Sequence, residues 1–138
     1  MKVIVVGGGQ IGSAVASSLL EHGHEIRIIE QQKSRIEYLK QEFSEDVLIL
    51  DNGTDPVVLE KAGIAKADVV AAVTGTDEVN LVASTLAKME FGVPKVVARV
   101  NHPKNRWLFT EMMGVDYPVD QAQILTHQIV DEDILEED

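Results

Sequence analysis

Short apolar runs alternate with longer amphipathic stretches along the chain. The runs are rich in Val and Ile, which is typical of strands that are buried on both faces of a sheet. The longer stretches carry apolar residues three or four positions apart, which predicts helices with one buried side. The expected strands are 2–6, 25–29, 47–50, 68–73, 95–100 and 115–118. The expected helices are 11–22, 33–43, 56–62, 77–90, 103–113 and a last one that begins at Gln121.

This regular alternation predicts the fold. Consecutive parallel strands need a crossover connection, and a helix provides it. Crossovers are right-handed, so the helices cover both faces of the sheet. We therefore expect an α/β fold of the Rossmann-like type, with a doubly wound parallel sheet of six strands. We assign residues 1–118 to this domain and residues 119–138 to a C-terminal helix with an acidic tail.

A glycine-rich segment connects the first expected strand to the first expected helix. Gly7, Gly9 and Gly12 match the spacing G-x-G-x-x-G. In this motif the first glycine permits a tight turn, the second lets a pyrophosphate approach the backbone, and the third lets the helix pack against the sheet. The start of the helix adds unpaired N–H groups and the positive end of its dipole. The pattern favours a dinucleotide site; the alternative is a tight turn that binds no ligand.

An acidic residue stands where the motif requires one. Glu30 stands at the carboxyl end of the second expected strand, directly after residues 25–29, and a carboxylate there accepts hydrogen bonds from both hydroxyls of an adenosine ribose. The same carboxylate would repel a 2′-phosphate, which disfavours NADP. Arg27 and Lys33 are near in sequence, but Glu30 is the expected ribose contact.

Further polar residues follow the other expected strands, where ligands bind in open α/β sheets. They are Asp51, Asn52, Gly53 and Thr54, then Thr74, Gly75, Thr76 and Asp77, and finally Arg99 and Asn101. A guanidinium suits phosphate, so Arg99 is a candidate phosphate ligand. Two alternatives stay open: Thr76 and Asp77 could cap the following helix, and Arg99 could pair with Asp51 or Asp77.

The composition narrows the classes of site. The 138 residues include no Cys, which excludes a disulfide framework, a thiolate metal site and a cysteine nucleophile. The net charge of −11 argues against nucleic acid or an anionic membrane as the partner of the whole surface. The four His residues are scattered, so we expect no metal site. A dehydrogenase needs an acid or base beside the nicotinamide, and we find no candidate for a catalytic residue.

Seven segments, spread over nearly the whole chain, carry a more specific pattern. They are V-V-G-G-G-Q-I-G at 5–12, L-D-N-G-T-D at 50–55, L-E-K-A-G-I at 59–64, A-D at 67–68, V-T-G-T-D-E-V-N at 73–80, V-A-R-V-N at 97–101 and G-V-D at 114–116. Together they resemble the TrkA-N, or RCK, domain. The resemblance implies a regulator of potassium channels or transporters that binds NAD(H), ATP or ADP. It also implies dimers or rings on the cytoplasmic side of a membrane pore.

The resemblance also implies roles for individual residues. Gly7, Gly9 and Gly12 would form the phosphate turn, Glu30 would hold the ribose, and Arg99 would reach phosphate. Asp51, Gly53 and Thr54 would lie near the adenine, and Thr74, Asp77 and Asn80 would line the far side. The full set of expected nucleotide-binding residues is Gly7, Gly9, Gln10, Ile11, Gly12, Glu30, Asp51, Asn52, Gly53, Thr54, Thr74, Gly75, Asp77, Asn80 and Arg99.

The sequence departs from the family in two respects. Asn52 stands where the family often has Gly, which puts the local turn in question. Such proteins commonly carry a second, C-terminal lobe, whereas this chain ends soon after the sixth strand–helix unit. We therefore expect either an excised N-terminal lobe or a natural short form.

The expected function is a cytoplasmic, nucleotide-binding regulatory subunit of a potassium channel or transporter, with NAD(H) as the first candidate ligand and ATP or ADP as the next. The alternatives are an NAD-dependent oxidoreductase, or its cofactor-binding fragment, and a nucleotide-sensing module attached to another effector. The last helix, with Ile124, Leu125, Ile129 and Ile134, is more apolar than a monomer needs. We expect it to pack on a second copy; the alternative is packing on its own sheet.

Overall fold

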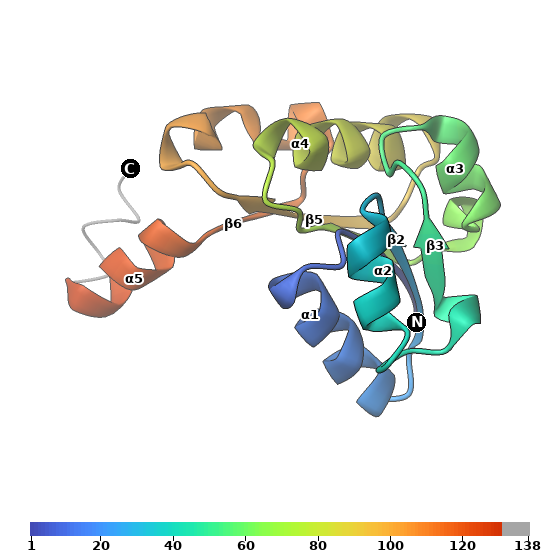
Figure 1. Cartoon of the computed structure of the whole chain (residues 1–138). Coiled ribbons are helices and arrows are strands. Elements are labelled where there is room, and N and C mark those ends of the chain that lie inside the picture. The colour runs from blue at the N-terminus through green and yellow to red at the C-terminus, as the bar shows by residue number, and fades with distance from the viewer. Residues whose placement is uncertain (131–138) are drawn as a thin grey trace.

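The computed structural model describes residues 1–130 and contains a six-stranded sheet. Neighbouring strands are parallel, in the order β3-β2-β1-β4-β5-β6 (Figure 1). The strands are β1 (Lys2–Val6), β2 (Glu25–Glu30), β3 (Leu48–Leu50), β4 (Val69–Ala72), β5 (Lys95–Val100) and β6 (Tyr117–Asp120). The order reverses between β1 and β4, which confirms the doubly wound, Rossmann-like α/β fold.

Two helical layers cover the sheet. Helices α1 (Gln10–Glu21) and α2 (Lys33–Leu39) lie on one face, and α3 (Pro56–Lys61) and α4 (Asp77–Thr85) lie on the other (Figure 1). Alternate residues of a strand point to opposite faces. Val3 and Val5 accordingly pack in the core under α1 and α2. Ile4 and Val6 pack in the other core, which includes Leu59 of α3.

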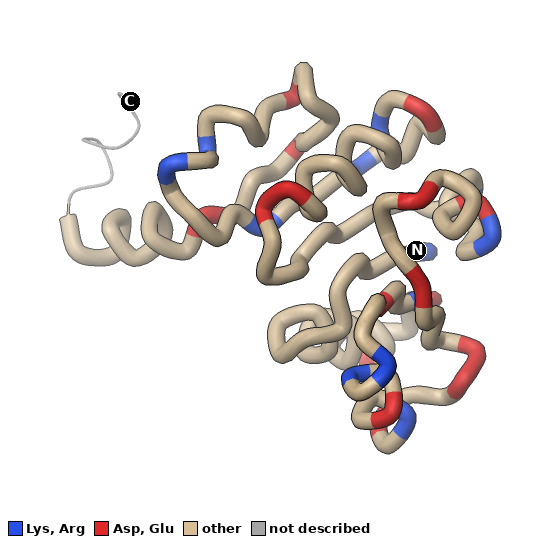
Figure 2. Tube along the Cα trace, turned by 45° about the horizontal axis from the view of Figure 1, so that its top comes forward, with Lys and Arg blue, Asp and Glu red and all other residues tan. Residues whose placement is uncertain are grey.

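Helix α5 (Gln121–Ile129) stands apart from these layers. It follows β6 and extends beyond the body of the domain (Figure 1). Asp120 caps its start by accepting hydrogen bonds from the N–H groups of Ala122, at 3.0 Å, and Gln123, at 3.3 Å. None of the α5 residues is buried, so the helix does not pack on its own sheet. Its nine residues include no Lys, Arg, Asp or Glu (Figure 2). Ile134, expected on the same helix, lies outside the described residues.

Three expected helices differ from the structure. Helix α2 ends at Leu39, and the chain buries Phe43 through a turn in which the Phe43 N–H donates to the Leu39 carbonyl. Helix α4 gives way to a π-helix, Leu86–Glu90. Residues 103–113 form two short 3₁₀-helices, Pro103–Leu108 and Glu111–Met113, in place of one helix. The Thr110 hydroxyl accepts a hydrogen bond from the Met113 N–H and caps the second 3₁₀-helix. This side-chain hydrogen bond competes with the backbone hydrogen bonds of one continuous helix.

The last strand lies later than expected. β6 covers Tyr117–Asp120 and not 115–118, so the sheet continues two residues past the expected domain boundary. Just before β6, the Asp116 side chain accepts a hydrogen bond from the Val96 N–H at 2.8 Å, and the Asp116 N–H donates to the Val96 carbonyl at 2.9 Å. A side chain, and not a backbone carbonyl, thus takes the Val96 N–H, which interrupts the regular ladder at this position. Pairing with β5 then begins at Tyr117. Pro118 is tolerated because β6 is an edge strand.

No helix within residues 1–130 has the length and apolar character that crossing a membrane requires.

Candidate functional site

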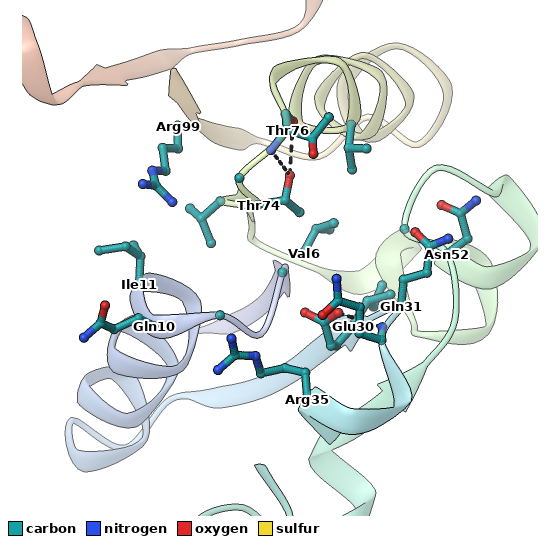
Figure 3. Close-up of a pocket in the computed structure, with 18 of the residues that line it drawn as sticks. Val6, Gln10, Ile11, Glu30, Gln31, Arg35, Asn52, Thr74, Thr76 and Arg99 are labelled. Atoms are coloured by element: carbon teal, nitrogen blue, oxygen red, sulfur yellow. Dashed lines mark hydrogen bonds between the residues drawn. The ribbon is translucent and has the colours of Figure 1, made fainter. Parts of the chain in front are cut away.

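A cavity of about 670 Å³ opens at the carboxyl ends of the strands (Figure 3). It lies where the strand order reverses, between β1 and β4, which is the position of ligands in open α/β sheets. It is large enough for a small organic ligand. The lining residues are Val6, Gly7, Gly9, Gln10, Ile11, Ile29, Glu30, Gln31, Gln32, Arg35, Asp51, Asn52, Gly53, Val73, Thr74, Gly75, Thr76, Val79 and Arg99.

The glycine turn forms the floor of the cavity, and its three motif glycines have different roles. Gly7 has a φ of +109°, and a Cβ there would lie 2.9 Å from the Thr74 methyl carbon. A Cβ at Gly12 would overlap the carbonyl oxygen of Gly7, so this glycine lets the helix approach the turn. A Cβ at Gly9 would meet nothing within 4 Å. Only Gly9 therefore leaves open space, and that space belongs to the cavity.

Helix α1 directs its N-terminus into this space. Gly9 is its N-cap residue and supplies no side chain to bond the first N–H groups. The N–H groups of a first helical turn have no partners within the helix. Since Gly9, Gln10 and Ile11 all line the cavity, these donors and the positive end of the helix dipole are available to an anion.

Glu30 connects the glycine turn to the start of α2. Its Oε1 accepts a hydrogen bond from the Gly8 N–H, and its Oε2 accepts one from the Gln32 N–H, both at 2.8 Å. The carboxylate is thus held in one orientation by two backbone donors. A carboxylate has about four lone-pair positions, so each oxygen keeps capacity for one further donor, such as a ribose hydroxyl.

Asn80 supports the wall of the cavity that Thr74 and Arg99 form, without lining the cavity itself. It is fully buried, and its Oδ1 accepts from the Thr74 N–H at 2.9 Å and from the Thr74 hydroxyl at 2.7 Å. Its Nδ2 donates to the carbonyls of Thr74, at 3.0 Å, and Arg99, at 2.9 Å. One carboxamide therefore fixes the backbone at the ends of both β4 and β5.

Asp77 also faces away from the cavity. Its carboxylate accepts from the N–H of Asn101 at 2.6 Å, the N–H of His102 at 2.9 Å, and the side-chain amide of Asn105 at 2.8 Å. Burial raises the pKa of Asp77, but these hydrogen bonds outweigh it and hold the pKa below its ordinary value. Asp77 thus fastens the segment after β5 to the start of α4.

A comparison with protein families decides the assignment. The model of the TrkA-N domain matches residues 3–121, which is most of the chain. The chain belongs to the TrkA-N domain family.

Curated relatives of this TrkA-N domain agree. It is 42% identical over 129 residues to the Trk system potassium uptake protein TrkA of Mycobacterium tuberculosis (strain ATCC 25618 / H37Rv), covering 94% of this chain and 58% of that protein. It is 36% identical over 119 residues to a TrkA homolog of Methanothermobacter thermautotrophicus, covering 86% of this chain and 54% of the relative. The chain thus spans a little over half the length of these relatives.

Solved structures share the fold. The TrkA-N domain of the inner membrane protein ybaL from Escherichia coli superposes with a TM-score of 0.78 at 18% identity, covering 93% of each chain. The GsuK RCK domain superposes with a TM-score of 0.74 at 24% identity, covering 89% of this chain and 26% of that one.

Most of the residues expected in the site of this TrkA-N domain do lie together. Those that line the cavity are Gly7, Gly9, Gln10, Ile11, Glu30, Asp51, Asn52, Gly53, Thr74, Gly75 and Arg99. Gly12, Thr54, Asp77 and Asn80 do not line it. Gly12 packs beneath the turn, and Asp77 and Asn80 lie behind the wall, as described above.

The turn after β3 accommodates the unusual Asn52. Its Oδ1 accepts from the Thr54 N–H at 2.9 Å and from the Thr54 hydroxyl at 2.7 Å, so Thr54 supports the turn and not the cavity. A Cβ at the next residue, Gly53, would lie 2.5 Å from a methyl carbon of Val6. Asp55 caps α3 by accepting a hydrogen bond from the Val57 N–H at 2.9 Å, and Pro56 is the first residue of the helix.

The structure tests the two alternative roles, the capping of α4 and the pairing of Arg99 with an aspartate. Thr76 occupies the N-cap position of α4, but its side chain makes no capping hydrogen bond. Within residues 1–130, the ion pairs are Lys40–Glu37 and Lys88–Asp116, so Arg99 pairs with neither Asp51 nor Asp77.

Sequence reasoning missed several lining residues, of which Arg35 is the most informative. The apolar residues Val6, Ile29, Val73 and Val79 and the polar residues Gln31 and Gln32 were also missed, whereas Thr76 was expected at a strand end but not included in the final set. Arg35 is the third residue of α2 and has no strand-end position to identify it. Its signal is its place in the first turn of the helix that follows Glu30.

Proposed function

We propose that the cavity binds an adenine nucleotide with at least two phosphates, NAD(H) first and ATP or ADP next. The observation that carries the proposal is the arrangement around Gly9. Open space lies over this residue, an uncapped helix N-terminus faces the space, and Glu30 is held beside it with free acceptor capacity. These groups match the phosphate and ribose of an adenosine phosphate, so the residues present fit such a ligand.

We further propose that binding regulates potassium transport. The curated relatives are potassium uptake proteins of the Trk system. One solved structure of similar fold is the GsuK channel bound to NAD, and another is GsuK bound to ADP. By analogy, this domain would act on the cytoplasmic side of a membrane potassium transporter or channel subunit.

The proposed role is regulatory and not catalytic. Within the described chain, the charged residues that line the cavity are Glu30, Asp51, Arg35 and Arg99. Glu30 is engaged by two backbone donors, and the lining there includes no His, Lys, Tyr or Ser that would serve as an acid or base beside a nicotinamide. Retention of the nucleotide without turnover is the expected behaviour.

The exposed apolar surface of helix α5 supports the proposal that two copies of the domain assemble. Leu125 is 62% exposed and Ile129 is 81% exposed, on a helix without charged residues. Such a surface is costly in water and is covered when two copies pack together. A nucleotide would then act by favouring one geometry between the copies, which requires that the two geometries bind it with different affinity.

Calorimetric titration of the ligand-free chain with NAD⁺, NADH, ADP and ATP tests the nucleotide site. We expect at least one of them to bind in the micromolar range, and NADH to stay reduced during prolonged incubation. No binding heat with any nucleotide at millimolar concentration would contradict the proposal. Oxidation of NADH with a small carbonyl substrate would favour the oxidoreductase instead.

Potassium uptake in cells tests the regulatory role separately. We expect that deletion of the gene slows the uptake of potassium, or of rubidium as its tracer, and that the intact gene restores it. Unchanged uptake in the deletion strain, with nucleotide binding intact in vitro, would separate this domain from potassium transport.

A further inference from the structure

Arg35 lines the cavity from the side opposite Arg99. Figure 3 shows the two guanidinium groups extending from different elements, α2 and β5, toward the space in front of the first turn of α1. Within residues 1–130 they are the basic side chains of the lining. A ligand that occupies this space lies between two positive charges.

The position of Arg35 follows from the hydrogen bonds of Glu30. This carboxylate joins the Gly8 N–H of the glycine turn to the Gln32 N–H, and Gln32 is the N-cap residue of α2. The first turn of α2 is therefore fixed relative to the glycine turn. Arg35 is half-buried, whereas the four residues before it, 31–34, are exposed, so its side chain turns inward.

Arg35 has no carboxylate partner in the described part of the chain. Neither of the ion pairs found there includes it. A half-buried guanidinium that faces a cavity is best compensated by an anion, and its planar group of donors suits phosphate oxygens.

On these grounds, and resting on the proposed nucleotide site, we propose that Arg35 makes the site selective for nucleotides with two or more consecutive 5′-phosphates. The N–H groups of the first turn of α1 serve one phosphate without help from α2. A second phosphate extends the negative charge across the cavity, and Arg35 and Arg99 then hold the pair from both sides. Arg35 is thus a specificity-determining residue that distinguishes the diphosphate from the monophosphate.

The test is the ratio of the dissociation constants of AMP and ADP, measured by calorimetry on the full chain. We expect the wild type to prefer ADP, and Arg35→Gln to reduce this preference about tenfold, mainly by weakening ADP. Arg35→Lys keeps the charge but not the two-pronged donor geometry, and should give an intermediate ratio. Lys33→Gln is the matched control, because Lys33 lies on the same helix with the same charge, is exposed and does not line the cavity. Its ratio should equal that of the wild type.

Three results would overturn the proposal. An equal loss of AMP and ADP affinity in Arg35→Gln, with unchanged thermal unfolding, would assign Arg35 to the nucleoside and not to the second phosphate. A larger loss for 2′,5′-ADP than for 5′-ADP would place Arg35 at the ribose 2′ position. An equal change in the ratio of the AMP and ADP dissociation constants for Lys33→Gln would show that the preference depends on net charge and not on the position of Arg35. Failure of the wild type to bind any nucleotide would instead remove the proposed site itself.

Discussion

Replacing Asn80 by Ala should destabilise the nucleotide-free domain by about 3 kcal/mol. The substitution removes four hydrogen bonds of a fully buried carboxamide, and each contributes about 1 kcal/mol net. We subtract about 1 kcal/mol because two of the partners retain other bonds. The Thr74 hydroxyl can still donate to the Thr76 carbonyl, and the Thr74 carbonyl still accepts from Asn101. The Thr74 N–H loses its bond to the carboxamide without such a substitute.

Urea unfolding of the ligand-free protein measures this cost. Ser84→Ala is the matched control, because Ser84 is equally buried on the same helix, one turn later, and its hydroxyl donates only to the Asn80 carbonyl. We expect the control to lose less than about 1 kcal/mol. Asn80→Asp keeps the shape but directs a carboxylate oxygen at the carbonyls of Thr74 and Arg99, so at neutral pH it should be at least as unstable as the Ala variant. A loss of under about 1 kcal/mol for Asn80→Ala, equal to the control, would refute this account of the wall.

Three further substitutions or conditions test the supports of the cavity. Glu30→Ala should lower the unfolding free energy of the ligand-free domain by about 2 kcal/mol, because the carboxylate accepts hydrogen bonds from two backbone N–H groups. Asp51→Ala releases only the N–H of its neighbour and should change the same free energy, measured by urea unfolding, by no more than about 0.5 kcal/mol. Equal losses would show that Glu30 has no structural role. Gly12→Ala should abolish cooperative thermal unfolding or lower its midpoint by more than about 10 °C, because the added methyl group would overlap the backbone carbonyl of Gly7. An unfolding midpoint equal to that of the wild type would contradict the close packing of the turn. The lowered pKa of Asp77 predicts a contribution to stability that is complete above its ordinary pKa of 3.8 and is lost as the pH falls through the lower pKa of the folded state. Asp77→Asn should therefore reduce the dependence of the unfolding free energy on pH, measured between about pH 5 and 2. An unchanged pH dependence in this variant would exclude the linkage.

Much of the fold could be predicted because its signals are local. The six apolar runs specify strands, and the glycine spacing identifies the turn between β1 and α1. The second strand is predicted at 25–29 and covers Glu25–Glu30 in the structure, so its end differs by one residue. The strand register at β6 could not be predicted in the same way. It depends on a contact between Asp116 and the Val96 N–H, which are far apart in sequence.

The site was predictable to the extent that its residues follow strand ends. Asp77 and Asn80 follow a strand end too, but their side chains turn back to bind backbone groups behind the wall. Arg35 shows the opposite case. It lies on a helix, and its inward direction results from the way Glu30 fixes the start of α2. The direction of a side chain at a helix start depends on tertiary contacts, and the spacing of apolar residues along the sequence does not reveal these contacts.

A phosphate bound to this domain should occupy the open space over Gly9, and the Gly9→Ala variant tests this placement. The backbone there, with φ −73° and ψ −163°, suits Ala, and the added methyl group meets no atom of the domain. Without ligand, the variant should therefore be as stable as the wild type or gain up to about 1 kcal/mol. With ADP, its affinity measured by calorimetry should fall at least tenfold, because the methyl group occupies the place of the phosphate. Equal ADP affinity in a folded Gly9→Ala variant would show that the nucleotide does not bind on this turn.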